Sequence, residues 1–399
     1  MRVGFVVDND VNSDIRVRKE LEIITGEGYD VTTLCFDFRK SYPDTSTGSK
    51  FERIRINRKI KDTLFFFLNL LPLYEFLWAQ WIRDFILKNE ISILHVHDLY
   101  MSKAAHKGIK KSGKKVSMIL DLHENYPASI TTYNWTKGFL RHLLSRPHAW
   151  AKKEKEYLNY ADRIIVLSES FKNDLLSRYQ KLKRENFTVF PNVPDPLKPE
   201  YHTKKNIGPL FRNNNPVIFY YGVVAERRGI FDTLEVFLRM IEEGKHANLL
   251  IVGPVDRSDS LKFKKMLEND PLSGYVYYIP WIDASDFPSY LDLSDICLAP
   301  FHKNPQHESG VANKVYDYML GAKPVVASDC KPQKELIEDY TCGVIFQNRE
   351  EFHEALIRLL ENESLREEMG MRGKNAILQK FNIASLKVNL TGLYKSLSE

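Results

Sequence analysis

Cysteine is scarce in this sequence, and its spacing gives no metal-binding pattern. The four cysteines, Cys35, Cys297, Cys330 and Cys342, form no CxxC pair or comparable ligand spacing. We therefore expect a reducing compartment, the cytoplasm. The apolar pattern of a first strand begins at Val3, so we expect no signal peptide before it.

Long uninterrupted hydrophobic runs are also absent. The nearest approach is the segment 63–82, where Asn69, Pro72, Glu75 and Gln80 interrupt the apolar residues, so a membrane-spanning helix is not expected. Two alternatives remain: a helix packed against the N-terminal sheet, which we favour, or an aromatic-rich helix lying on an anionic bilayer. A basic run just upstream supports the second alternative; it consists of Arg53, Arg55, Arg58, Lys59 and Lys61.

Positive charge is concentrated in the first half of the chain. Residues 1–200 hold 33 Lys and Arg against 25 Asp and Glu, whereas residues 201–399 hold 24 against 27. A basic half suggests an acidic partner, either an anionic membrane surface or an acidic substrate. No recognised nucleic-acid motif occurs, so nucleic acid is not the expected partner.

Short apolar runs alternate with helical patterns along the 399 residues, which predicts parallel α/β sheets in two domains of ordinary size. In the first half, strands are predicted at residues 2–7, 31–36, 93–97, 116–120, 164–167 and 188–190. In the second half, they are predicted at residues 217–221, 249–252, 276–279, 296–299, 324–327 and 343–346. Helices are predicted at residues 15–26, 230–241 and 313–320, and most of residues 350–397 has a helical pattern.

A proline-rich break separates the two series of strands. It begins at Pro191, and the Pro-, Lys- and Asn-rich stretch that continues to about Asn215 is typical of an interdomain linker. Two α/β halves joined in this way place a cleft between the carboxyl ends of two sheets, where such folds bind ligands.

The segment from Glu308 to Asp329 has the pattern loop, helix, turn and strand. A helix entered from a loop containing Gly310 offers free backbone N–H groups and the positive end of its dipole to an anion. Lys314 adds positive charge there, and Asp317, one turn further on, can accept hydrogen bonds from a sugar hydroxyl. This combination fits a nucleoside diphosphate with its ribose; the alternative is an ordinary αβ unit with surface charges.

A second glycine-containing loop, Gly222–Gly229, connects a predicted strand to a predicted helix. Such a loop is another place for phosphate, and Arg228 could reach the phosphate through its forked donors. The loop is a weak signal alone. It becomes more specific because it belongs to the same predicted domain as Lys314 and ends another strand.

Histidines mark the strand ends of the first half. His123 follows a predicted strand within D-L-H-E-N-Y-P, where it can hydrogen-bond a sugar hydroxyl or carry a proton; a structural role is the alternative. His95, His97 and Asp98 form a further polar cluster at a strand end. These residues contain no closed ligand set, so we predict no metal site.

The first βα loop contains the sequence Asp8-Asn9-Asp10, which resembles a carboxylate pair for Mg²⁺. Its position directly after a strand favours a different role. We expect Asp10 to line the cleft or to cap the following helix.

Together these segments resemble the GT-B glycosyltransferases, in the large retaining group called family 4, and the resemblance covers nearly the whole chain. Its landmarks are Asp14–Val17, Gly28–Val31, the D-L-H-E-N-Y-P segment, Ala161–Ser168, Pro191–Val193 and, most specifically, Asn313–Val326. The resemblance implies an α/β fold with two Rossmann-like domains facing each other across a cleft. Residues 1–200 would form the acceptor side and residues 201–375 would bind the nucleotide sugar. Residues 376–399 would form a helix crossing back to the N-terminal domain.

The resemblance also implies metal-independent transfer of a hexose from a UDP- or GDP-linked sugar, with retention of anomeric configuration and without a cofactor. The catalytic residues would be His123 and Glu308. The donor-binding residues would be Gly222, Arg228, Gly310, Asn313, Lys314 and Asp317. The acceptor-side residues would be Asp10, Asp14, Arg16, His97 and Glu124.

Two positions depart from the family pattern. The first of the two donor-site glutamates falls on Ser309, with Glu308 one residue earlier, and Val223 stands where an arginine is frequent. These departures keep open the alternative of a non-catalytic GT-B scaffold in a glycan-assembly complex. A nucleotide-sugar epimerase is a further alternative, although no convincing set of acid/base carboxylates supports it.

The expected acceptor is a glycan or a lipid-linked sugar, as in bacterial surface polysaccharide assembly. The basic first half and the segment 63–82 suit such an acceptor at the inner face of the plasma membrane. Peripheral association with an anionic membrane is therefore part of the expectation.

Overall fold

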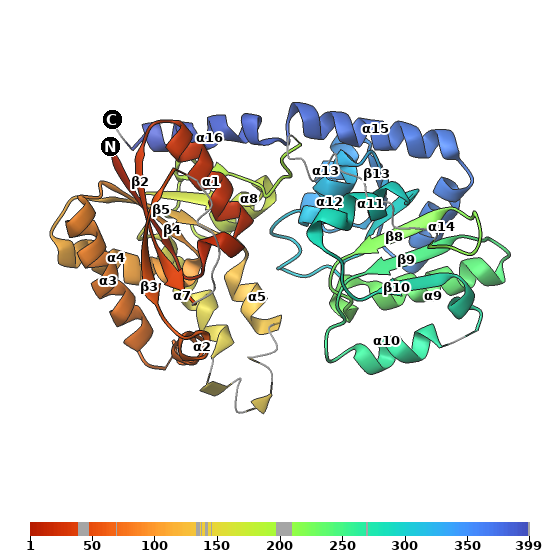
Figure 1. Cartoon of the computed structure of the whole chain (residues 1–399), viewed down its shortest axis with the longest axis horizontal. Helices are drawn as coiled ribbons and strands as arrows, with labels where there is room; N and C mark the ends of the chain where they lie inside the picture. The colour runs from red at the N-terminus through yellow and green to blue at the C-terminus, as the bar shows by residue number, and fades with distance from the viewer. Residues whose placement is uncertain are drawn as a thin grey trace. The chain divides into compact units, whose positions relative to one another are not determined.

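A computed structural model of the chain describes residues 1–38, 48–68, 70–132, 136, 138–139, 143–144, 146–196, 210–268 and 270–397. The chain divides into two compact units (Figure 1). The first comprises Met1–Asn192 with Leu386–Glu399, and the second comprises Val193–Ser385. Most of the predicted linker, residues 197–209, lies outside the described residues.

In the described part of the first unit, seven parallel strands form one sheet with the order β3-β2-β1-β4-β5-β6-β7. The strands are β1 Arg2–Val7, β2 Asp30–Asp37, β3 Lys50–Arg55, β4 Ile93–His97, β5 Ser117–Asp121, β6 Arg163–Val166 and β7 Phe187–Val189. The strand order reverses its direction between β1 and β4. Ligands of doubly wound sheets bind beside this switch, at the carboxyl ends of the strands.

Helices cover both faces of the first sheet (Figure 1). They are α1 Ile15–Gly26, α2 Arg58–Phe66, α3 Leu73–Asn89, α4 Ser102–Ser112, α5 Tyr126–Thr132, α7 Trp150–Leu158, α8 Glu169–Arg178 and α16 Ile383–Lys395. Residues of α3, α4, α7 and α8 form one core with every second strand residue, including Val6, Leu94 and Leu120. The intervening residues point to the opposite face, which α1 and α16 cover.

The structure corrects the prediction for residues 50–82. Lys50–Arg55 forms the edge strand β3, which the sequence pattern did not reveal, because charged residues dominate it as they often do on sheet edges. The segment 63–82 is two helices rather than one. Pro72 precedes α3, where a residue without an N–H group costs no hydrogen bond. Trp78, Ile82 and Phe85 of α3 are buried against the sheet, as the favoured alternative predicted.

In the described part of the second unit, six parallel strands have the order β10-β9-β8-β11-β12-β13, which repeats the doubly wound plan. They are β8 Val217–Tyr221, β9 Asn248–Val252, β10 Val276–Ile279, β11 Ile296–Ala299, β12 Val325–Ser328 and β13 Gly343–Phe346. The helices are α9 Ile230–Glu242, α10 Ser260–Leu267, α11 Phe287–Asp292, α12 Asn313–Leu320, α13 Lys331–Tyr340, α14 Arg349–Leu360 and α15 Glu363–Gln379. The switch of strand order lies between β8 and β11.

The last helix, α16, completes the first unit. Leu386, Leu390, Leu393 and Tyr394 are buried, and the Tyr394 hydroxyl lies 2.7 Å from His95 Nδ1 of β4. Residues from Leu386 onward therefore belong to the first unit, although the predicted helical segment began at residue 376. Among all helices in the described ranges, none combines the length and the hydropathy that crossing a bilayer requires.

Candidate functional site

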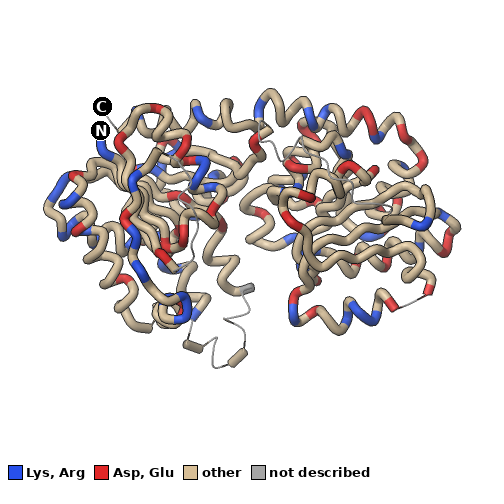
Figure 2. Tube along the Cα trace, viewed as in Figure 1, with Lys and Arg blue, Asp and Glu red and all other residues tan. Residues whose placement is uncertain are grey.

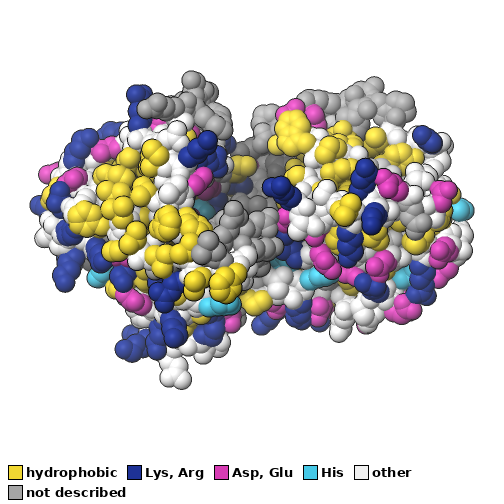
Figure 3. Space-filling model, turned by 90° about the horizontal axis from the view of Figure 1, so that it is seen from below, with side chains coloured by type: hydrophobic (Ala, Val, Ile, Leu, Met, Phe, Trp, Pro, Cys, Tyr) yellow, Lys and Arg dark blue, Asp and Glu magenta, His cyan; other side chains and the backbone are white. Residues whose placement is uncertain are grey.

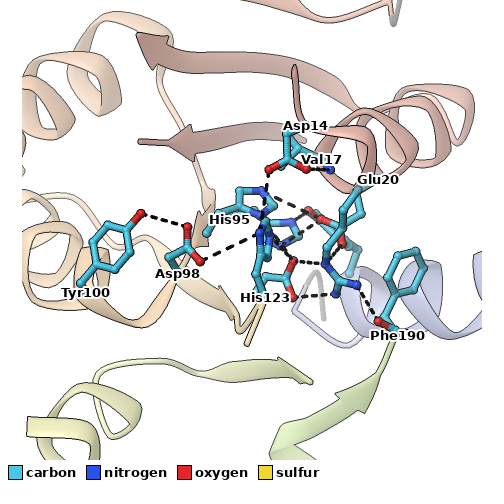
Figure 4. Close-up of polar contacts among 12 residues, drawn as sticks. Asp14, Val17, Glu20, His95, Asp98, Tyr100, His123 and Phe190 are labelled. Carbon is cyan, nitrogen blue, oxygen red and sulfur yellow. Dashed lines mark hydrogen bonds and ion pairs between the residues drawn. The ribbon is translucent and has the colours of Figure 1, made fainter. Parts of the chain in front are cut away.

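The first polar cluster lies at the carboxyl ends of β4 and β5 (Figure 4). Because strand side chains alternate between faces, His95 and His97 of β4 and Asp121 of β5 point toward the face covered by α1. Leu94 and Leu120, which directly precede His95 and Asp121 in sequence, join the core on the other face. His95, His97 and Asp121 are fully buried. Alternation in two neighbouring strands thus gathers these polar groups beside the switch of strand order.

Arg16 of α1 occupies the centre of this cluster. Its Nε and Nη2 donate to the two carboxylate oxygens of Asp121 at 2.8 and 2.7 Å, and its Nη1 donates to the Phe190 carbonyl at 2.8 Å. Glu20 Oε1, one helical turn away, lies 3.3 Å from Arg16 Nε. A forked pair of this kind fixes distance and orientation together. Arg16, predicted on the acceptor side, therefore contacts protein groups in the interior.

The two buried carboxyl groups have opposite pKa shifts. Burial raises the pKa of Glu20 well above its ordinary value, and the negative charge of Asp121 raises it further. Burial acts in the same direction on Asp121, but the charges of Arg16 and His123 outweigh it and hold the pKa of Asp121 well below its ordinary value. Asp121 is therefore held as a carboxylate, whereas burial favours the protonated form of Glu20.

His123 is the member of this cluster that reaches the surface, with 18% of its side chain exposed. Its Nε2 lies 3.1 Å from Asp121 Oδ2 and 3.0 Å from His97 Nδ1, and its Nδ1 lies 3.9 Å from a carboxylate oxygen of Asp14 and of Asp98. Burial lowers the pKa of His123, but Asp98 and Asp121 outweigh burial and raise this pKa to about 10. His123 is therefore a hydrogen-bond-donating imidazolium at neutral pH.

The two carboxylates beside His123 are themselves held in place (Figure 4). Asp14 caps α1, since its Oδ1 accepts a hydrogen bond from the Val17 backbone N–H at 3.1 Å. Asp98 accepts a hydrogen bond from the Tyr100 hydroxyl at 3.1 Å, and its backbone has a φ of 71°. A positive φ is uncommon for residues other than glycine and concentrates at functional sites.

The inner end of the cluster is neutral. Burial lowers the pKa of both His95 and His97, so neither ring carries a charge at neutral pH. The two rings stack with centroids 4.6 Å apart. His97 was predicted on the acceptor side; because it is fully buried, it acts through the contact of its Nδ1 with His123.

The remaining residues predicted on the acceptor side are Asp10 and Glu124. Asp10 is buried and caps the short turn Val11–Ser13, where its Oδ1 accepts from the Asn12 N–H at 3.0 Å. Glu124 is half-buried, and its carbonyl oxygen accepts from the Tyr126 N–H at 2.9 Å. Asp10 therefore caps this short turn, whereas Asp14 caps the predicted helix that follows.

Within the described residues, one group has the composition of a metal site: Glu20, His95, His97 and Asp121, with one ligand atom from each lying within 4.8 Å of the others. Arg16 already pairs with both carboxyl groups of this set. A divalent cation would have to displace that guanidinium or share its partners, which like-charge repulsion disfavours. The donor set therefore fits poorly with a metal ion.

The second cluster lies in the second unit, where β8 ends and α12 begins. Gly222 follows β8 with a φ of 135°, and a Cβ atom added at this position would lie 3.9 Å from Lys314 Nζ. The glycine loop and the lysine of α12, which the sequence analysis treated as separate phosphate signals, are thus neighbours. Only glycine combines this backbone conformation with an open approach to the ammonium group.

Aromatic rings support the cations of the second cluster. Lys314 Nζ lies 3.7 Å from the ring centre of Tyr220 and 4.8 Å from that of Phe301. The guanidinium carbon of Arg228 lies 5.1 Å from the ring centre of Phe301. Both cations therefore contact Phe301, and the aromatic faces offset part of the cost of their burial.

Neither cation is neutralised within the described part of the chain. Lys314 Nζ and Arg228 Nε are buried without a hydrogen-bond partner there, and no carboxylate lies within ion-pair distance of either group. Burial lowers the pKa of Lys314 well below its ordinary value, and the charge of Arg228 lowers it further. Burial also lowers the pKa of Arg228. Because buried cations are normally paired, this arrangement fits an anionic ligand.

A second glycine fixes the loop that carries Arg228. Gly229 has a φ of 73°, and a Cβ atom there would lie 1.7 Å from the Pro300 carbonyl oxygen. The backbone that follows Arg228 is thereby held against the end of β11. Arg228 reaches Phe301 from this loop, so the close approach determines where the guanidinium lies.

The predicted donor residues of α12 lie around its first turn. Asn313 begins the helix and is exposed, whereas Lys314 is buried; Gly310, before the helix, and Asp317, one turn into it, are half-buried. Lys314 therefore belongs to the first turn of α12, whose backbone N–H groups lack helical partners. Gly222, Arg228 and Lys314 are brought together directly, and the other three residues border them along α12.

Glu308 has a partner of its own. Its Oε1 accepts a hydrogen bond from the Lys331 backbone N–H at 3.0 Å, at the start of α13. Ser309, at the position of the expected first glutamate, is buried and donates through Oγ to the Gln306 carbonyl at 2.7 Å. The Glu308 carboxylate therefore stabilises a helix N-terminus in this structure.

Several residues of the two clusters were not recognised from the sequence: Glu20, Asp121 and Tyr394 in the first cluster, and Tyr220, Phe301 and His307 in the second. Glu20 follows Arg16 by one helical turn. This spacing indicates an ion pair and could have been recognised in the sequence. His307 is buried, and burial together with the neighbouring cations lowers its pKa to about 4. Its proximity to Arg228 and Lys314 follows from loop geometry, which the sequence does not contain.

Both halves of the chain match glycosyltransferase family models. Residues 22–196 match Glycosyltransferase Family 4, and residues 202–376 match Glycosyl transferases group 1. An uncharacterized glycosyltransferase of Methanocaldococcus jannaschii is 24% identical over 56% of this chain and 55% of its own length. The capsular polysaccharide biosynthesis glycosyltransferase CapM of Staphylococcus aureus is 22% identical over 61% of this chain and 64% of its own length.

The chain thus spans between about half and two-thirds of these curated relatives. Solved structures match over nearly the whole chain. Sucrose-phosphate synthase from Thermosynechococcus elongatus superposes with a TM-score of 0.75 at 16% identity, covering 100% of this chain and 99% of that one. The Anabaena protein HepE in complex with UDP superposes with a TM-score of 0.68 at 12% identity, covering 99% and 100%. At these identities the superpositions establish the GT-B fold, and together with the family models they support a GT-B glycosyltransferase.

Proposed function

We propose that the protein is a metal-independent, retaining glycosyltransferase whose donor is a UDP- or GDP-linked sugar. The observation that carries this proposal is the pair of unneutralised cations beside the loop at Gly222, the buried Lys314 and the half-buried Arg228. A diphosphate would supply the negative charge that both cations lack. The two family models and the UDP complex of the Anabaena neighbour add support.

Lys314 and Arg228 would act on the leaving group. When the bond between the anomeric carbon and the diphosphate oxygen breaks, negative charge collects on the diphosphate. The two cations and the N–H groups in the first turn of α12 would stabilise that charge. The acceptor oxygen would bond to the anomeric carbon on the face that the diphosphate leaves, and the acceptor proton would depart with the diphosphate.

His123 would contact the donor sugar near the reacting carbon as a hydrogen-bond donor. Its pKa of about 10 means that it keeps its proton at neutral pH, so a role as general base is disfavoured. Asp317 would accept hydrogen bonds from ribose hydroxyls. Glu308 would remain a helix-capping residue unless donor binding releases it from the Lys331 N–H.

We assign the acceptor to the class of glycans or lipid-linked sugars of bacterial surface polysaccharides, handled at the inner face of the plasma membrane. The name of the Staphylococcus aureus relative, which refers to capsular polysaccharide biosynthesis, supports this class. The basic balance of residues 1–200 supports an anionic surface or acceptor.

A thermal-shift screen against UDP, GDP, ADP, TDP and CMP tests the donor site. One nucleoside diphosphate should raise Tm by mass action, and Lys314→Ala and Arg228→Ala should each abolish the rise. Arg239→Ala is the matched control, because this exposed arginine of α9 pairs with Glu243 and Glu350. No rise with any nucleotide would contradict the proposal.

Once the nucleotide base of the donor is known, activity assays of the purified protein distinguish the remaining alternatives. An anomeric-proton NMR spectrum of the product should show the configuration of the donor. Conversion of the donor without acceptor would favour an epimerase. Nucleotide binding without transfer to any glycan or lipid-linked acceptor would favour a non-catalytic scaffold.

A further inference from the structure

The first unit has an apolar groove between α3 and α4 that neither polar cluster involves. The groove has a volume of about 620 Å³. It is lined by Leu71, Pro72, Leu73, Phe76, Ala79, Lys107, Lys110 and Lys111. Figure 3 shows hydrophobic side chains gathered on the surface of the first unit, with Lys and Arg around them.

The apolar side chains of this groove are unusually exposed for their type. Leu71, just before α3, is 55% exposed, and Leu73 and Phe76 in its first turns are 47% and 52% exposed. Single exposed leucines are ordinary on protein surfaces, whereas contiguous apolar exposure marks an interaction site. The exposure follows from the break at Pro72, since the residues around it leave the helical stripe that buries Trp78 and Ile82.

Lysines of α4 border the apolar residues. Lys107 pairs with Glu75 of α3, and Lys111 Nζ lies 4.7 Å from the ring centre of Phe76. Lys110 and Lys111 form no ion pair with any described residue, and they lie in the last turn of α4. Two cations beside an apolar groove complement an amphiphile that carries a negative head and a hydrocarbon tail.

The basic residues singled out in the sequence analysis are mostly occupied elsewhere. Arg53 pairs with Asp10, Arg55 with Asp37 and Lys61 with Asp8. Their charges are therefore compensated within the first unit. Arg58 and Lys59 of that run remain exposed, and the lysines of α4, which follow the segment 63–82 in sequence, add further charge for an anionic surface (Figure 2).

We propose that this groove is the site at which the first unit binds an anionic phospholipid bilayer. Acyl chains contact Leu71, Leu73 and Phe76, and lipid phosphates contact Lys110 and Lys111. The proposal deepens the assignment of a membrane-linked acceptor, on which it rests for its biological setting only. Its test uses lipid binding and does not depend on nucleotide binding or transfer, so the two assignments fail separately.

Vesicle co-sedimentation of the full chain tests the proposal, with phosphatidylcholine vesicles that contain or lack phosphatidylglycerol. Binding should require the anionic lipid. The double variant Lys110→Glu/Lys111→Glu should weaken it by at least about 25-fold, since each lysine near an anionic surface contributes roughly fivefold. The triple variant Leu71→Ser/Leu73→Ser/Phe76→Ser should weaken it by about tenfold or more, because it removes the groups that enter the bilayer.

The matched control is Leu261→Ser/Lys265→Glu on α10, which removes an exposed leucine and an exposed lysine from the second unit. It should leave vesicle binding unchanged. All variants change exposed or half-exposed side chains, and equal Tm values would establish that they fold. Equal binding to both vesicle types, or a control that weakens binding as strongly as the groove variants, would overturn the proposal. Concentration-dependent dimerisation abolished by the groove variants, without vesicle binding, would assign the groove to a second copy of the chain.

Discussion

The two units share one sheet plan, but their polar clusters balance charge in opposite ways. In the first unit, the guanidinium of Arg16 meets the carboxylate of Asp121 in a forked pair, and His123 lies among three carboxylates. In the second unit, the buried Lys314 and the half-buried Arg228 contact aromatic rings and pair with no carboxylate within the described residues. A cluster whose charged groups pair with one another can hold a neighbouring side chain in place. A cluster whose cations have no partner is suited to bind an anionic ligand.

This difference assigns distinct roles to the two clusters. The first holds a partly exposed imidazolium, His123, in a fixed protonation state and orientation. In the second cluster, the unneutralised cations destabilise the free protein, and an anionic ligand would remove that destabilisation.

The largest effect is expected at Asp121. Asp121→Asn would leave Arg16 and His123 without their charged partner in the interior, and the free energy of unfolding should fall by about 3–5 kcal/mol. Urea denaturation measures this change. Asp174→Asn is the matched control, because Asp174 pairs with Arg178 at the surface and its loss should cost less than about 1 kcal/mol. A loss at Asp121 no larger than that of the control would remove the support role from the first cluster.

Arg228→Ala should act on binding and not on folding. Loss of charge-assisted hydrogen bonds to a diphosphate should weaken nucleotide binding by about 1.5–3 kcal/mol, roughly 10- to 150-fold in Kd. Isothermal titration calorimetry provides the measurement, with Arg239→Ala as control. Because Arg228 forms no ion pair with the described residues, the Tm of the free protein should change little. A large loss of Tm with unaltered affinity would reverse the contrast between the clusters.

The protonation of His123 should depend on Asp98. NMR titration of the wild-type protein should show this imidazole losing its proton near pH 10, and Asp98→Asn should lower that pKa by about one unit, or ~1.4 kcal/mol. The pKa is raised in the folded state, so this group's contribution to stability is complete below its ordinary pKa, near 6.5. That contribution is lost as the pH rises through about 10. A His123 signal that titrates near pH 6.5 in the wild type would contradict the proposed imidazolium.

The smallest expected effect is an increase in stability, caused by a substitution at Lys314. Lys314→Met keeps the apolar stem against Tyr220 and removes the buried ammonium, so the free protein should become more stable by about 1 kcal/mol, and its Tm should rise by about 2–4 °C. Nucleotide binding should be lost at the same time. Differential scanning calorimetry with and without nucleotide checks both effects. A fall in Tm would mean that the lysine is satisfied in the free protein.

The pH dependence of nucleotide binding complements that substitution. Burial lowers the pKa of Lys314 in the free protein, and a bound diphosphate would raise it again, so binding should take up a proton between those two pKa values. Affinity should therefore decline as the pH rises through that window. Calorimetry in two buffers of different ionisation enthalpy would detect the proton, and Lys314→Met provides the control that lacks it.

The sheets were predictable because their strands are buried on both faces. The sequences of such strands are therefore short apolar runs. β1, β4, β8, β10, β11 and β13 have the predicted boundaries. Strand β3 escaped prediction since an edge strand exposes one side to solvent and tolerates Arg53 and Arg55. The break at Pro72 was visible in the sequence, but the exposed groove that results depends on how α4 packs against α3.

The two clusters differ in how much of them the sequence reveals. His123, Arg228 and Lys314 follow strands or begin a helix, so their positions at ligand-binding edges could be inferred from local pattern. Their supporting residues could not be found in this way. Tyr394 contacts His95 across 299 residues of sequence, and Phe301 joins Lys314 and Arg228 only because two loops meet. Such contacts are set by tertiary packing, which local periodicity does not encode.

Helix α16 has a consequence for the order in which the protein can mature. The first unit contains both the beginning of the chain and its end, and Leu390 and Tyr394 fill the face of the sheet that holds Phe5 and His95. During synthesis, the second unit leaves the ribosome with all of its strands before those residues emerge. The first unit must therefore wait, with part of its core uncovered, until α16 has been translated. A nascent chain stalled before Leu386 would hold a finished second unit and an unfinished first one.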